Sequence, residues 1–173
     1  MLIKTVSVAA AATLLLAGCS SSSKSTPAAA PKPSINGALG TVSTSLGTIL
    51  TDNSGKTLYR FAPDSAGKSN CDAACLKYWP AVSAPAAVPS SVAGVNAAIG
   101  SLTRSDGTKQ LTVAGFPVYT YVGDSAPGMA SGQGKNLSGG LWWVLSNAGA
   151  PITSAPAPAS SSAGGGGGGY GGY

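Results

Sequence analysis

Short apolar, β-branched runs alternate with turn residues along most of this chain, and helical periodicity is scarce. Residues 46–51 are a short run of residues that favour β-strands. They are followed by Asp-Asn-Ser-Gly, in which Asx side chains bond the local backbone and glycine accepts positive φ. Residues 46–51 and 56–61 are therefore predicted to form a hairpin. The other predicted strands are 99–104, 109–113, 116–122 and 141–145, with turns at 106–107 and 114–115.

One segment, residues 69–80, is predicted to be helical. Ser69 or Asn70 can cap its start, good helix formers follow, and a proline ends it. Cys71 and Cys75 are four positions apart, which places them on one face of a helix. An ideal helix holds such side chains somewhat too far apart for a relaxed disulfide, so a bridge would require a distorted first turn.

A short pattern occurs twice, sixty positions apart: tyrosine, any residue, an aromatic residue, two residues and an aspartate. Its members are Tyr59, Phe61 and Asp64 in the first copy, and Tyr119, Tyr121 and Asp124 in the second. The two aromatic side chains of a copy point to one face of a strand, and the aspartate can accept N–H groups of the following loop. We predict one structural corner used twice. The alternative is a pair of Tyr/Asp binding or catalytic sites.

These elements predict a mainly β fold with one short helix that carries two cysteines. Two tandem related β units, about 46–82 and 99–146, are expected to share one core as a small sandwich or a barrel-like unit. The domain would span residues 36–152, enough for one modest core and too short for two ordinary domains.

Both ends of the chain differ from this domain. Residues 1–18 are predicted to be a lipoprotein signal peptide: a lysine, then about a dozen apolar residues, too few for the roughly 20 that span a bilayer, then Leu-Ala-Gly before Cys19. We expect lipidation of Cys19; an ordinary secretory signal with an incidental cysteine is the alternative. Residues 19–35, rich in Ser, Ala and Pro, are predicted to be a flexible tether, and 153–173 a disordered tail.

Composition excludes several kinds of chemistry. The chain has no histidine, and its five acidic residues are all aspartates. A histidine-based triad and a histidine-ligated zinc or haem site are therefore excluded, and no cofactor or metal is expected. The formal net charge is +5, but the lysines and arginines are scattered. Nucleic-acid binding is not expected, whereas weak attraction to anionic envelope polymers is.

Two cysteines remain once Cys19 is assigned to lipid. Cys71 and Cys75 form an even pair in an oxidising compartment, where disulfides persist. They are interpreted as a structural disulfide or two buried thiols. The alternative is an exchangeable disulfide, with the nearby Tyr78 and Trp79 relaying electrons.

These landmarks resemble a known family, the predicted bacterial lipoproteins with the Tyr-x-(Phe/Trp/Tyr)-x-x-Asp motif, also called the secreted repeat of unknown function. The similarity covers about residues 46–145. It includes both motif copies, both domain cysteines, Trp79-Pro80, Gly115-x-Pro117-Val118-Tyr119, residues 123–128, Gly132-Gln133-Gly134 and Gly140-x-Trp142. The family commonly has His where this chain has Phe116 and a second Asp where it has Met129, so no metal or acid–base role is expected there. The resemblance implies location and architecture, but no particular activity.

We therefore expect a lipid-anchored envelope protein on the extracytoplasmic side of a bacterial membrane. Its most favoured role is a non-enzymatic binding or structural module, with the membrane and either envelope polymers or another envelope protein as partners. A redox or electron-transfer protein that uses Cys71 and Cys75 is the second hypothesis, and it requires an exposed, reducible pair. A hydrolase is the third, and it would need Asp64 or Asp124 in an open cleft beside a serine or lysine.

Overall fold

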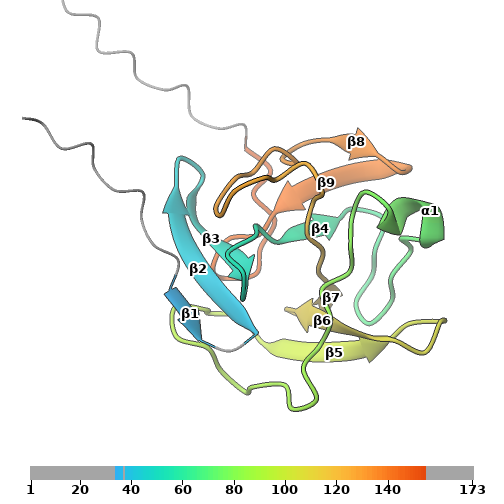
Figure 1. Ribbon diagram of the computed structural model, residues 1–173, viewed down its shortest axis with the longest axis horizontal. Coiled ribbons are helices and arrows are strands. Elements are labelled where there is room, and N and C mark those ends of the chain that lie inside the picture. Colours follow the sequence, from blue (N-terminus) through green and yellow to red (C-terminus); the bar gives the residue numbers. More distant parts are fainter. Residues whose placement is uncertain (1–33, 37, 155–173) are drawn as a thin grey trace, which may run out of the picture. The chain divides into compact units, whose positions relative to one another are not determined.

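The computed structural model of the protein describes residues 34–36 and 38–154 (Figure 1). Strands make up most of the regular structure of this part of the chain, which confirms the expected mainly β fold with one short helix. The elements in chain order are β1 (Ser34–Asn36), β2 (Leu39–Thr44), β3 (Gly47–Asp52), β4 (Tyr59–Phe61), α1 (Ala73–Leu76), β5 (Ile99–Thr103), β6 (Lys109–Val113), β7 (Phe116–Pro117), β8 (Asn136–Leu137) and β9 (Gly140–Val144).

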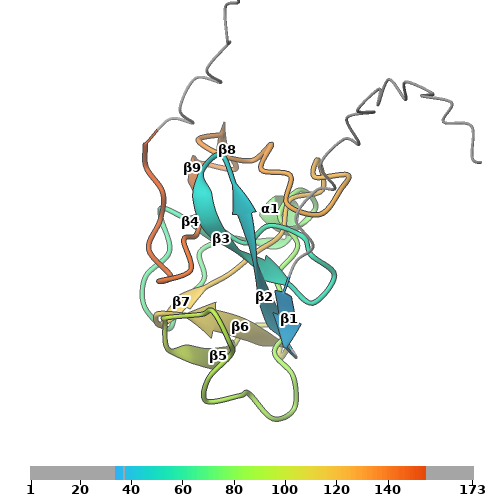
Figure 2. The same ribbon diagram turned by 90° about the vertical axis from the view of Figure 1, so that its left-hand side faces the viewer.

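The strands of the described residues form three antiparallel sheets, each of three strands (Figures 1 and 2). Their strand orders are β1-β2-β3, β4-β9-β8 and β5-β6-β7. Isolated bridges such as Ile49 with Ser146 and Tyr59 with Tyr119 link the sheets at single residues, but these strands do not close into a barrel. The β4-β9-β8 sheet pairs β4, which precedes α1, with β9 near the end of the domain. The two halves of the chain are therefore joined by main-chain hydrogen bonds.

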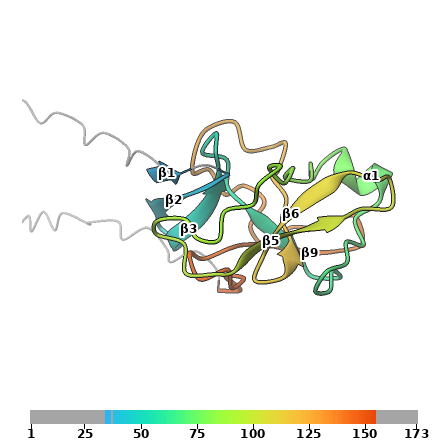
Figure 3. The same ribbon diagram turned by 90° about the horizontal axis from the view of Figure 1, so that it is seen from below.

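The hairpins β2–β3 and β5–β6 are counterparts in the two repeats. Figure 3 shows both in one view, the first in blue and the second in yellow. Val42 lies opposite Ile49 in the first hairpin, and Leu102 lies opposite Gln110 in the second. Each hairpin leads within a few residues to a motif tyrosine, so equivalent elements position the two copies of the motif.

The two repeats meet at Tyr59 and Tyr119, whose backbones bond each other in both directions. The Tyr59 N–H donates to the Tyr119 carbonyl at 2.8 Å, and the Tyr119 N–H donates to the Tyr59 carbonyl at 3.1 Å. Matching bonds flank this centre at 3.1 Å, from Leu145 N to the Leu58 carbonyl and from Val82 N to the Val118 carbonyl. Each repeat thus supplies a strand partner for the other, in an arrangement with approximate twofold symmetry.

Side chains of both repeats share the core, as expected from the sequence. One cluster is rich in aromatic residues and contains Val42, Ile49, Tyr59, Phe61, Cys71, Cys75, Trp79, Tyr119, Trp142 and Val144. The other is aliphatic and contains Leu39, Leu50, Leu58, Val92, Leu111, Val113, Val118 and Leu145. Both clusters draw on residues from before and after the connection at 84–98, so each repeat completes its core with side chains of the other.

The helix is shorter than predicted and begins at a different residue. α1 is capped by Asp72, whose carboxylate accepts the N–H of Cys75 at 2.9 Å. The expected caps bond other groups instead: Ser69 contacts Tyr119 of the other repeat, and Asn70 donates to Asp64 in the preceding loop. Cys71 therefore lies before the helix, and the disulfide joins the chain entering α1 to its first turn without requiring the helical distortion that was expected.

The predicted hairpin of residues 46–51 with 56–61 forms beside its turn, where Thr51 bridges Thr57 and Leu58 N donates to the Leu50 carbonyl at 3.0 Å, but it does not extend along the two strands. Asp52 Oδ1 accepts the N–H groups of Ser54 and Lys56 at 2.8 and 2.9 Å. However, β3 pairs with β2, which was not predicted, and β4 pairs with β9. The predicted strand at 116–122 is likewise reduced to the two residues of β7. Long-range pairing overrides the local pattern in each case.

Several predicted features lie outside the described residues. These are the signal peptide, Cys19, and nearly all of the tether and the tail. Within residues 34–36 and 38–154, no helix has the length and apolar character needed to cross a membrane.

Candidate functional site

The first motif tyrosine bonds the aspartate of the second repeat. Tyr59 begins β4, and its buried hydroxyl donates to Asp124 Oδ2 at 2.7 Å. The same hydroxyl accepts the N–H of Gly132 at 3.1 Å. The other carboxylate oxygen, Asp124 Oδ1, accepts the N–H of Ser131 at 2.8 Å. The loop after Asp124 is therefore fastened both to its own aspartate and to a tyrosine of the other repeat.

The second motif tyrosine makes the reciprocal contact. The Tyr119 hydroxyl donates to Asp64 Oδ2 at 2.7 Å, and Asp64 Oδ1 accepts the N–H of Asn70 at 2.7 Å. Ser69 Oγ lies 2.7 Å from the Tyr119 hydroxyl, at the place that a backbone N–H occupies in the other set. We call Tyr59 with Asp124 the first Tyr–Asp clasp, and Tyr119 with Asp64 the second.

The clasps are almost completely removed from solvent. Tyr59 and Tyr119 are 0 % exposed, Asp64 is 6 % exposed and Asp124 is 3 % exposed. A buried carboxylate is costly unless its oxygens are hydrogen-bonded, and here every carboxylate oxygen has a donor. Neither aspartate lines either of the two clefts described below, so the open geometry required by the hydrolase hypothesis is not found at these residues.

Burial dominates the electrostatics of the clasps. It raises the pKa of Asp64 and Asp124 above the ordinary value, although the hydrogen bonds that each carboxylate accepts oppose the rise. Burial, together with the neighbouring aspartate, also raises the pKa of Tyr59 and Tyr119. Both hydroxyls therefore keep their protons well above neutral pH and remain donors.

The second aromatic residue of each motif ends a column of four stacked rings. Trp79 and Trp142 are stacked at its centre, with ring centroids 3.8 Å apart and an interplanar angle of 3°. Phe61 stacks on Trp142 at 4.3 Å, and Tyr121 stacks on Trp79 at 4.4 Å. The second aromatic residue of each motif thus covers the tryptophan of the other repeat. These stacks are a second set of contacts between the two repeats, after the clasps. These aromatic contacts add to the stability gained by burial.

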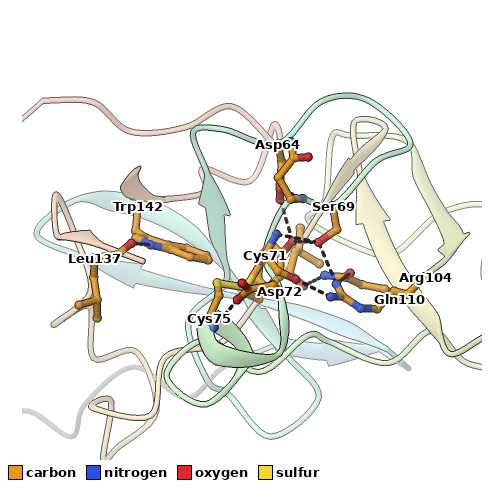
Figure 4. The surroundings of a disulfide bond; sticks show 12 residues. Asp64, Ser69, Cys71, Asp72, Cys75, Arg104, Gln110, Leu137 and Trp142 are labelled. Atoms are coloured by element: carbon orange, nitrogen blue, oxygen red, sulfur yellow. Dashed lines mark hydrogen bonds between the residues drawn. A yellow bond between two sulfur atoms is a disulfide. The ribbon is translucent and has the colours of Figure 1, made fainter. Parts of the chain in front are cut away.

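A disulfide joins Cys71 to Cys75, with the Cα atoms 5.2 Å apart (Figure 4). Both cysteines are buried. The guanidinium of Arg104 donates to the Cys71 carbonyl at 2.6 Å, to Ser69 Oγ at 2.9 Å and to Gln110 Oε1 at 2.6 Å. Arg104 comes from the second repeat, so the disulfide loop is also held by residues from across the interface.

The structure has two sizeable clefts among the described residues. One, of about 470 Å³, runs beside the disulfide loop and is lined by Gly67, Lys68, Ser69, Asn70, Cys71, Asp72, Ala73, Leu76, Leu102, Thr103, Arg104, Ser105 and Asp106. The other, of about 600 Å³, is lined mainly by small and apolar residues: Ala38, Asp52, Asn53, Ala81, Val82, Ser83, Ala84, Pro85, Ala87, Pro89 and Thr120. In the described part of the chain, no three Cys or Asp side chains gather as metal ligands would.

Sequence reasoning identified the motif residues but missed their partners. It did not pair the tyrosine of one copy with the aspartate of the other, and it gave no role to Trp142, Gly132 or Arg104. One signal was available for the tryptophans, because Trp79 and Trp142 are 63 positions apart, close to the spacing of the motif. For Gly132 and Arg104 no local pattern marks a contact with the other repeat.

Comparison with known proteins agrees with the duplicated architecture. A family model described as a secreted repeat of unknown function matches residues 40–83 and, a second time, residues 100–146. Each match begins in the first strand of a hairpin, β2 or β5, and extends a few residues past a tryptophan of the stacked column. No curated protein and no solved structure matches the chain.

Proposed function

Because this chain belongs to the family of secreted repeats of unknown function, we propose that it is a lipid-anchored, non-enzymatic module of the bacterial envelope. In this proposal residues 1–18 are removed, Cys19 carries the lipid, and the tether separates the two-repeat domain from the membrane surface. Two or three acyl chains suffice for stable anchoring without a spanning helix, since each buried methylene contributes about 0.8 kcal/mol.

The burial of both Tyr–Asp clasps carries the proposal of a non-enzymatic role. A catalytic tyrosine or aspartate must reach a substrate, whereas these four side chains bond one another and the two loops inside the core. The most conspicuous chemical groups of the sequence are thus occupied in joining the two repeats. This supports a rigid binding or structural unit.

The partners that we propose are the membrane, through Cys19, and an envelope polymer or a neighbouring envelope protein. The positive charges of the domain are scattered, which is compatible with weak attraction to anionic polymers and does not favour nucleic acid.

The anchor is tested by comparing the full chain with Cys19→Ser in a bacterial host. The wild-type chain should fractionate with membranes and have a mature N-terminus at Cys19 that carries acyl mass. The variant should lose the acyl mass and leave the membrane fraction. A wild-type N-terminus at any other residue would refute the anchor.

The non-enzymatic role is tested by incubating the full chain with isolated envelope polymers and analysing the products by mass spectrometry. We expect binding without any new product. A product that forms with wild type but not with a folded Asp124→Asn variant would show that the motif is catalytic, and would overturn the proposal.

The exchangeable-disulfide hypothesis gains no support from the structure. It requires an accessible pair, whereas Cys71 and Cys75 are 2 % and 3 % exposed. Thiol–disulfide exchange needs direct attack on a sulfur atom, so a partner thiol would have to enter the core.

A further inference from the structure

We propose that the first Tyr–Asp clasp is a site of reversible one-electron oxidation, reached from the surface through the stacked rings of Tyr121 and Trp79. This activity goes beyond the structural role, because it uses the clasp as a store for one oxidising equivalent. The oxidants concerned are diffusible radicals of the peroxyl or carbonate class outside the cell.

The aromatic rings provide a continuous path. Tyr121 is half-buried and so reaches solvent, and its ring stacks on Trp79 with centroids 4.4 Å apart. The edge of Tyr59 meets Trp79 with centroids 5.3 Å apart. Phenol and indole rings are among the most easily oxidised side chains, and rings in contact exchange electrons over short distances. An electron can therefore leave buried Tyr59 although no oxidant can touch it.

Asp124 supplies what oxidation of a buried phenol requires, which is a proton acceptor. A phenol that has lost an electron becomes a strong acid, and the Tyr59 hydroxyl is already hydrogen-bonded to Asp124 Oδ2 at 2.7 Å. In the step that we propose, one electron passes from Tyr59 through Trp79 and Tyr121 to the oxidant, so that a peroxyl radical becomes the peroxide anion and a carbonate radical anion becomes carbonate. The O–H bond of Tyr59 breaks, and its proton forms a new bond to Asp124 Oδ2. The products in the core are a neutral phenoxyl radical and a carboxylic acid.

The step is reversible because only a proton moves, and it moves along an existing hydrogen bond. A one-electron donor at the surface, such as a phenol or an ascorbate-like enediol, returns the electron by the same path. The proton then moves back from Asp124 to Tyr59. The Gly132 N–H donates to the Tyr59 oxygen at 3.1 Å and holds that oxygen in position in both the reduced and the oxidised state.

Oxidised Trp79 takes an electron from Tyr59 because its own indole proton has no acceptor. Its buried indole N–H has no hydrogen-bond acceptor among the described residues, whereas that of Trp142 donates to the Leu137 carbonyl at 2.8 Å. Oxidised Trp79 therefore remains a cation, a stronger oxidant than a neutral radical, and takes an electron from Tyr59.

The second clasp is less suited to this role. Two arginines, Arg104 and Arg60, favour the charged form of Asp64, whereas Lys56 is the cation that acts on Asp124. A carboxylate stabilised by two cations is a poorer proton acceptor.

The test uses the full chain with the exposed and tail tyrosines removed as Tyr78→Phe/Tyr170→Phe/Tyr173→Phe. A photogenerated ruthenium(III) polypyridyl complex oxidises this background protein, and transient absorption and EPR detect the radical. We expect a neutral phenoxyl radical that disappears in Tyr59→Phe and persists in Tyr119→Phe. A phenoxyl signal that survives Tyr59→Phe unchanged would overturn the proposal.

Asp124→Asn tests the proton acceptor, since an amide can accept the hydrogen bond but cannot take the proton at neutral pH. We expect phenoxyl formation to slow by at least about tenfold, because a positioned proton acceptor typically contributes 10²–10⁴-fold. Asp52→Asn, the same change in an exposed turn, should leave the rate unchanged. A rate that is equal in Asp124→Asn and the background protein refutes the proposal.

A second measurement needs no change in the clasp. In deuterated water the background protein should form the phenoxyl radical more slowly, because the proton moves with the electron. An absent isotope effect refutes the coupled transfer to Asp124 whether or not the Asp124→Asn variant folds.

Discussion

Tyr59→Phe is the substitution that most directly tests whether the clasps hold the two repeats together. It removes one oxygen atom and keeps the ring that packs against Trp79. Two hydrogen bonds are lost: the one donated to Asp124 at 2.7 Å, and the one accepted from Gly132 at 3.1 Å. No water can easily replace the oxygen, because Asp124 is 3 % exposed.

The expected loss follows from the groups left behind. A hydrogen bond to a charged group contributes about 1.5–3 kcal/mol, and leaving a buried N–H without an acceptor costs about 1–3 kcal/mol. Some relaxation of the loop at Gly132 will offset part of this sum. We therefore expect Tyr59→Phe to lower the free energy of unfolding by about 2–4 kcal/mol, a large share of the 5–15 kcal/mol typical of a domain.

The assay is urea unfolding followed by tryptophan fluorescence, with the midpoint compared at an unchanged m-value. Tyr78→Phe is the matched control, because Tyr78 is 51 % exposed and no hydrogen bond of its hydroxyl to another described residue is found. It should change stability by less than about 0.5 kcal/mol. If Tyr59→Phe had an equally small effect, the clasp could not be a structural fastener.

Three further predictions follow. Gly132→Ala should cost about 1–3 kcal/mol in urea unfolding, because its Cβ would lie 2.8 Å from ring atoms of Trp79 and Tyr59. Cys71→Ser should lower stability by only about 2 kcal/mol, since the disulfide closes a very short loop; a variant that does not fold would contradict this. Burial and the neighbouring aspartates raise the pKa of Tyr59 and Tyr119 above the unfolded value of about 10. Their contribution to stability should thus be complete below pH 10 and decline as pH rises above it, which unfolding curves across that range will show.

Features of this fold that are encoded locally could be predicted from the sequence. The turn at Asp52 was correct because its carboxylate bonds the backbone within four residues. The turn at Ala114 and Gly115 was correct as well, and both residues have positive φ, 50° and 82°. In each case the residues that determine the conformation are adjacent in the chain.

Strand partners and helix length could not be predicted, because distant residues determine them. β4 has the composition of a strand, but nothing in its three residues specifies pairing with β9 rather than with β3. The predicted helix lost its first turn because Asn70 donates to Asp64 and Ser69 contacts Tyr119. Both residues are engaged in these contacts, and Asp72 caps the helix instead.

The clasps between the two repeats explain why the motif occurs twice in the sequence. A clasp inside one repeat would need Tyr and Asp only once, and a second copy could diverge freely. Here each motif tyrosine bonds the aspartate of the other copy, and each second motif aromatic stacks on the tryptophan of the other repeat. A repeat that lacks its tyrosine or its aspartate therefore leaves a buried polar group of the other repeat without its partner. Because the contacts follow an approximate twofold relation, they are those that a symmetric pair of identical units would make, with residue i on j and j on i. The chain is thus the covalently joined equivalent of such a pair, and the two copies of the motif are the two halves of one self-complementary interface.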